Sequence, residues 1–244
     1  MFRRATTWIQ NRLQLSAREL ALSDRESNAG FHSLIGLFVF GLLLIMGIQS
    51  FPQLIPDLMR RYAFQGYLVV TVLIMLLRGY RPLVSFNLRA LYWTVGLSAT
   101  TLGIFQLIDW GVAIFFPRFE IAMHRETSWP SAEHFFFVAV LAPVAEEFFF
   151  RDFVFRGLLT RFGYRFSWAM ILGSLFFMVA HLQVYPGAFV LGLVGCVVVG
   201  LSRSIYPSIL FHSICNLSWF YIPILFPNLR AVLEDWGLIG LFYR

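Results

Sequence analysis

The sequence predicts an all-α fold, a polytopic transmembrane helix bundle with seven to eight membrane helices. Three observations lead to this prediction. Hydrophobic residues make up 59% of the chain, charged residues only 13%, and the mean hydropathy is +0.72. A soluble domain carries about 25% charged residues, so this chain has too few charges to cover a surface that faces water. We therefore expect the lipid bilayer to be a partner of most of the chain.

The apolar residues gather in seven segments and a candidate eighth. A span needs roughly 20 apolar residues, so segments 62–77 and 187–201 are short, and we expect flanking polar residues or tilt to make up the difference. The third could continue to Phe116, and the existence of the eighth stays open. The segments are 29–51, 62–77, 90–108, 133–159, 166–182, 187–201 and 205–226, with 231–243 as the candidate.

The segments form one domain, because neither internal repeats nor low-complexity linkers divide them. Residues 1–28 are polar and rich in arginine, and we expect a cytoplasmic segment in which Trp8, Ile9 and Leu13 favour a short interfacial helix. Residues 29–244 form the membrane domain. Pro186-Gly187 predicts a tight turn, and Cys196 and Cys215, both in apolar segments, are expected as free core residues.

The arginines predict the orientation of the bundle, and no lysine occurs in the chain. With the N-terminus inside, most arginines fall on the inner side, which the positive-inside rule favours. This distribution explains the net charge of +6 better than nucleic-acid binding does. Because the loops are compact and lysine is absent, we expect a bacterial inner membrane. The outer loops hold only Arg60, Arg61, Arg118 and Arg125.

The fourth segment carries the most informative charges, Glu146, Glu147 and Arg151. An ionisable residue at membrane depth costs about 2.5–3.5 kcal/mol on insertion scales. Glu147 and Arg151 have the i,i+4 spacing, acid first, that favours an ion pair. The Glu146 side chain points about 100° away from that of Glu147 around the helix. It lacks a local ion-pair partner, so it is the candidate catalytic residue. The alternative is that these charges mark the membrane interface.

Two later segments add His181, His212 and Asn216. His212 and Asn216 are four residues apart and share a helix face. If each helix is measured from its inner end at 1.5 Å per residue, these groups and Glu146 lie within a band about 10 Å deep. A single histidine on an apolar helix is usually a core residue, but this combination predicts a shared site.

Such a site could hydrolyse an amide in two ways. Glu146 and His181 could activate a water molecule while His212 and Asn216 donate hydrogen bonds to the oxyanion. Alternatively, Glu146, His181 and His212 could bind Zn²⁺ and leave a fourth position for water. We rank zinc second because no HExxH motif is present. A serine protease is disfavoured because GxSxG and Ser-Lys arrangements are absent.

At these residues the chain resembles the CPBP family, the CAAX prenyl proteases and bacteriocin-processing (Abi) enzymes. The family motifs EExxxR, FxxxH and HxxxN correspond to Glu146-Glu147-Phe-Phe-Phe-Arg151, Phe177-Met-Val-Ala-His181 and His212-Ser-Ile-Cys-Asn216. The resemblance covers residues 130–220. It implies eight helices, a site open to the cytoplasm, water activation by Glu146 and His181, a Glu147–Arg151 pair, and an oxyanion hole of His212 and Asn216.

The resemblance predicts an intramembrane endopeptidase, with a metallopeptidase mechanism as its variant. Its partners would be protein or peptide substrates at the membrane, and no nucleic acid. Two alternatives stay open. One is a non-catalytic scaffold or bacteriocin-immunity protein of the same fold, and the other is a transporter that relays protons through the buried groups. The substrate and the oligomeric state are beyond the sequence.

Overall fold

The computed structural model describes residues 11, 13–21, 36, 39–41, 43–45, 47, 57–86, 88–115, 131–181 and 186–225, and for 57–62, 105–115 and 219–225 the backbone path alone. Every regular element in these ranges is helical, which confirms the all-α prediction. Within the same ranges, no helix combines the length and the apolar character required to cross a membrane.

Five separate helices are α3 (Asp57–Leu77), α4 (Leu88–Phe115), α8 (Phe166–Ala180), α9 (Pro186–Ser202) and α10 (Tyr206–Leu225). Each corresponds to a predicted apolar segment. The second segment is extended by polar residues, as expected, and the third continues nearly to Phe116. Pro186 begins α9 instead of forming a turn, so that prediction was wrong. A proline fits a first helical turn because its missing N–H has no partner there anyway.

Residues 132–161 form one continuous helix, which we call the central helix. It consists of α5 (Ala132–Phe136), the π-helical segment η1 (Phe137–Leu141), α6 (Ala142–Glu147), the π-helical segment η2 (Phe148–Phe155) and α7 (Arg156–Arg161). The residue at each junction keeps right-handed helical angles. Ser131 begins the helix by accepting a hydrogen bond from the His134 N–H at 3.2 Å.

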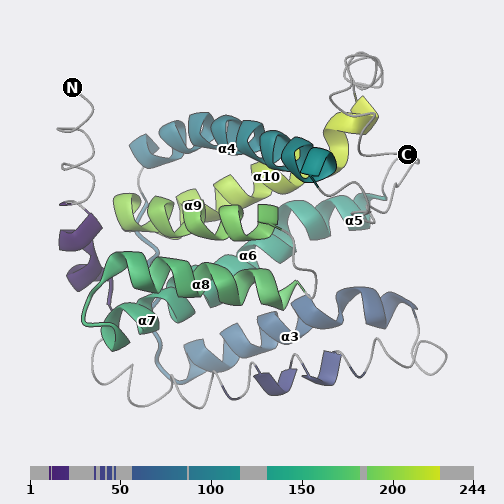
Figure 1. Ribbon diagram of the computed structural model, residues 1–244. Helices are drawn as coiled ribbons and strands as arrows, with labels where there is room; N and C mark the ends of the chain where they lie inside the picture. Colours follow the sequence, from purple (N-terminus) through teal and green to yellow (C-terminus); the bar gives the residue numbers. More distant parts are fainter. Residues whose placement is uncertain are drawn as a thin grey trace, which may run out of the picture.

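Figure 1 shows the helices stacked in layers, with α3 at one side and α4 at the other. The central helix and α8 follow α3, and α9 and α10 lie between them and α4. Small residues allow a close approach between α8 and α9. A Cβ atom added at Gly192 would lie 2.8 Å from the Ser174 Cβ.

A buried polar cluster joins the far end of the central helix to two other segments. Arg156 pairs with Asp152 at 2.9 Å and donates to the carbonyls of Leu20 at 2.6 Å and Arg81 at 3.1 Å. The Leu83 N–H donates to Asp152 at 3.1 Å. Residues 13–20, part of the predicted N-terminal segment, therefore pack on the core through Arg156.

Tyr80 completes this cluster. Its hydroxyl donates to the Asp152 carbonyl at 2.7 Å and accepts from Arg156 at 2.8 Å. Burial, with the nearby Asp152 charge, raises the pKa of Tyr80 well above its ordinary value. The phenol therefore stays neutral and keeps the proton that it donates to the helix.

Some predictions fall outside the described residues. These are the candidate segment 231–243, most of the first segment, and the interfacial helix as far as it involves Trp8 and Ile9. Cys196 and Cys215 are buried and free, as predicted.

The contact between α8 and α9 makes a stability prediction. Gly192→Ala must push the Ser174 backbone away, since the added Cβ would also lie 2.9 Å from the Ser174 Cα. We expect a loss of about 1–3 kcal/mol in the free energy of unfolding, the usual cost of overpacking, measured by denaturant unfolding in detergent. Gly96→Ala is the control, because nothing lies within 4 Å of its added Cβ. Equal stability of the two variants would contradict this packing.

Candidate active site

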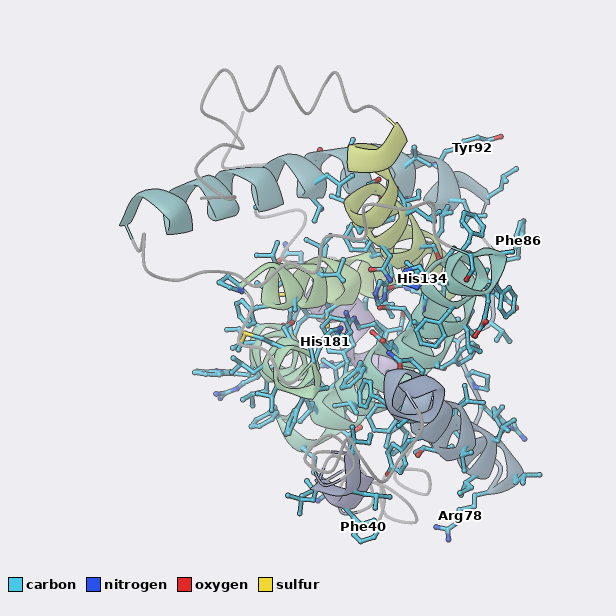
Figure 2. All side chains as sticks on the ribbon, turned by 90° about the vertical axis from the view of Figure 1, so that its right-hand side faces the viewer. Phe40, Arg78, Phe86, Tyr92, His134 and His181 are labelled. Carbon is cyan, nitrogen blue, oxygen red and sulfur yellow. The ribbon has the colours of Figure 1, made fainter. Side chains whose placement is uncertain are left out.

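Glu146 lies between the two histidines that the sequence places on other helices. Its Oε2 atom is 3.6 Å from the His181 Nε2 atom and 3.8 Å from the His212 Nε2 atom. Glu146 and His212 are buried. The three side chains come from the central helix, the residue that follows α8, and α10. Figure 2 shows His181 among the ribbons of the bundle in projection, whereas Phe86 and Tyr92 lie at its edge. The fold thus brings the expected acid and both imidazoles together.

Backbone geometry orients His181. Its Nδ1 atom lies 2.8 Å from the Phe177 carbonyl oxygen. Because a carbonyl only accepts, Nδ1 must carry the hydrogen, and the neutral ring then presents the Nε2 lone pair towards Glu146. The His181 side chain is 35% exposed, whereas that of Glu146 is 3% exposed. Of these two groups, His181 is therefore the one that solvent or a substrate can reach.

Glu147 faces a different set of groups. Its Oε1 atom lies 2.9 Å from the His212 Nδ1 atom and 3.3 Å from the Arg151 Nη2 atom, and its Oε2 atom accepts a hydrogen bond from Ser208. The expected Glu147–Arg151 ion pair is thus present. Because the carboxylate accepts from the His212 Nδ1–H, the Nε2 atom of that ring is turned towards Glu146.

Arg151 is seated by shape as well as by charge. Its guanidinium carbon lies 4.0 Å from the centre of the Phe177 ring, which is a favourable cation–π distance. On α9, a Cβ at Gly195 would lie 2.7 Å from the Arg151 Nε atom. Glycine at this position therefore makes room for the guanidinium. Phe177 also contacts both imidazoles, with ring centres 4.5 Å from His181 and 5.7 Å from His212.

Asn216 contacts the backbone of the central helix. Its Nδ2 atom donates to the Val138 carbonyl at 3.2 Å. Among the described residues, no hydrogen bond connects Asn216 with Glu146, His181 or His212. The structure therefore brings five of the six expected residues into direct contact with one another and places Asn216 against the backbone of the central helix.

Two contributors to the site were not singled out from the sequence. Ser208 precedes His212 by four residues, so it lies on the same face of α10 and could have been found by that spacing. Gly195 gave no such signal. Its importance depends on how closely α9 approaches the central helix. That distance is a property of the folded structure and cannot be read from the sequence.

The sequence also suggested a zinc site. In the described part of the chain, no three His, Cys, Asp or Glu side chains are arranged to hold a metal ion. Glu146, His181 and His212 have suitable ligand atoms, but the structure does not arrange them as a metal site. We therefore assign no chemical step to a metal.

The Glu147 contacts predict the effect of Ser208→Ala. A hydrogen bond to a buried carboxylate would be lost, which costs about 1.5–3 kcal/mol, and His212 would lose part of its support. We expect a lower unfolding midpoint together with reduced activity. Ser213→Ala, on the same helix, should change neither quantity. If Ser208→Ala matched this control, Ser208 would not support Glu147.

One of three comparisons with known proteins found a match. Residues 128–218 match the family model described as type II CAAX prenyl endopeptidase Rce1-like. All six candidate site residues lie inside the matched range. Searches of the curated proteins and of the solved structures each returned no match. Over residues 128–218, the chain is therefore similar to the Rce1-like CAAX prenyl endopeptidases.

Proposed function

We propose that this protein is an intramembrane endopeptidase that hydrolyses peptide bonds of membrane-associated proteins or peptides with water activated by Glu146 and His181. The observation that carries the proposal is the position of the Glu146 Oε2 atom, 3.6 Å and 3.8 Å from the two histidine Nε2 atoms. The match of residues 128–218 to a protease family model supports the reaction class.

These separations suit a bridging water. They are too long for direct hydrogen bonds, which span about 2.7–3.2 Å. A water beside the line that joins Glu146 and His181 can lie about 2.8 Å from both atoms. Both atoms are acceptors when His181 is neutral, so the water donates both hydrogens and turns its lone pairs towards the substrate. Glu146 then takes a proton as the oxygen attacks the amide carbon.

His212 is the proposed electrophilic partner. Its Nδ1 atom lies 2.9 Å from the Glu147 carboxylate, and this contact holds the ring with its Nε2 atom turned towards Glu146. A hydrogen on Nε2 would donate to the oxygen that gains negative charge. Arg151 lies 3.3 Å from the same carboxylate, so Glu147 is not left as an uncompensated buried anion. A zinc-dependent mechanism is the alternative.

We extend the proposal to a membrane location. Support comes from the mean hydropathy of +0.72 and from large apolar side chains exposed on the described helices. These include Val70, Leu73 and Leu77 on α3 and Trp168 and Val179 on α8. Exposed groups of this kind fit contact with lipid. The arginine distribution supports a cytoplasmic N-terminus, and we propose a bacterial plasma membrane.

Glu146→Gln tests the proposed reaction, with Glu133→Gln as the matched control. Glu146→Gln retains the shape of the side chain and removes the base, so we expect peptide cleavage to fall by about 10²–10⁴-fold at an unchanged unfolding midpoint. Glu133 is on the same helix but exposed, and its variant should cleave normally. Cleavage of a peptide library by purified protein in detergent is the measurement.

Other outcomes decide between the alternatives. Full cleavage by Glu146→Gln and by His181→Ala would reject the mechanism. Full biological activity of a variant that does not cleave would favour a scaffold or immunity protein. Stoichiometric zinc in the active sample would favour the metal-dependent mechanism. Dependence on a proton gradient would favour a transporter.

A further inference from the structure

A carbonyl group in the central helix lacks its usual helical donor. In an α-helix, the Val138 carbonyl would accept from the Ala142 N–H, but that N–H donates to the Phe137 carbonyl instead. In a π-helix the donor would be residue 143, which is a proline without an N–H. Val138 is buried, so leaving its carbonyl without a donor would be costly.

Asn216 supplies the missing donor. Its side-chain nitrogen lies 3.2 Å from the Val138 oxygen, and since a carbonyl only accepts, the nitrogen end of the amide must point at it. The contact is supported by packing, because α10 lies against both η1 and α6. Prolines inside apolar helices are tolerated when neighbouring side chains satisfy the freed backbone groups.

We propose that Asn216 is a positioning residue that holds the π-turn before Pro143 and thereby sets the direction of Glu146. Glu146 follows Pro143 by three residues, less than one helical turn. A change between π and α geometry alters the helical phase by about 100° for each residue gained or lost. Loss of the Asn216 contact would therefore turn Glu146 relative to His181 and His212. This inference rests on the proposed function of Glu146 and assigns Asn216 a role other than oxyanion binding.

A double-mutant cycle with Pro143→Ala tests the proposal. The alanine restores an N–H, so the Val138 carbonyl regains a donor within its own helix. Asn216→Ala alone should lower kcat/KM by about 10- to 100-fold, the effect of an unsatisfied buried carbonyl. In the Pro143→Ala background, Asn216→Ala should cost less than about threefold. If Asn216 acts on the substrate instead, the loss will be equally large in both backgrounds, which would overturn the proposal.

The matched control is Pro207→Ala, a buried proline at the start of α10. It should leave the full effect of Asn216→Ala in place, because it adds no donor near Val138. A rescue by Pro207→Ala equal to that by Pro143→Ala would also overturn the proposal.

Unfolding midpoints of the same variants keep the test independent of activity. If Pro143→Ala is itself inactive, the drop in midpoint caused by Asn216→Ala should still disappear in its background. An unchanged drop would overturn the proposal. If the wild-type protein cleaves no peptide, the proposed function fails, whereas the midpoint cycle still shows whether Asn216 bonds to the Val138 carbonyl.

Discussion

The arrangement of the site depends on the buried Glu147 carboxylate. It joins the central helix to α10 through His212 and Ser208, and it neutralises Arg151 on its own helix. Removing one partner from such a group leaves a buried charge without compensation, which costs far more than the net value of the pair. Glu147 therefore fixes both the spacing between the central helix and α10 and the tautomer of His212. It does not itself face the proposed water between Glu146 and His181.

The central helix has a second constraint, which appears in both of its π-helical segments. In each, a backbone carbonyl accepts from a side chain of another segment, Val138 from Asn216 and Asp152 from Tyr80. Wide helical turns are often found at functional sites. Here they lie before Glu146 and after Glu147, so the two carboxylates are held between externally supported turns. Pro143 explains the first π-helical segment, η1. The second, η2, contains no proline, and the feature that distinguishes it is the hydrogen bond from Tyr80.

Much of the architecture was predictable because apolar runs and helix breaks are local properties. The predicted segments became α3, α4, the central helix, α8, α9 and α10, with small shifts at their ends. The Glu147–Arg151 pair followed from i,i+4 spacing, and it persists although Arg151 lies in a π-helical segment. Pro186 was misjudged because a proline signals a turn and a helix start equally well, and only the following backbone distinguishes them.

The sequence by itself determined the helical class and the motif residues, since these depend on residue type and spacing along one helix. Tertiary structure alone decided which groups face one another: Glu146 between two imidazoles, Ser208 on Glu147, Gly195 beneath Arg151, and Asn216 on the Val138 carbonyl. The physical reason is that a hydrogen bond between helices requires the donor and acceptor atoms to be placed to within about an ångström. Helical periodicity predicts the face of a residue, but not the atom that it meets across the interface.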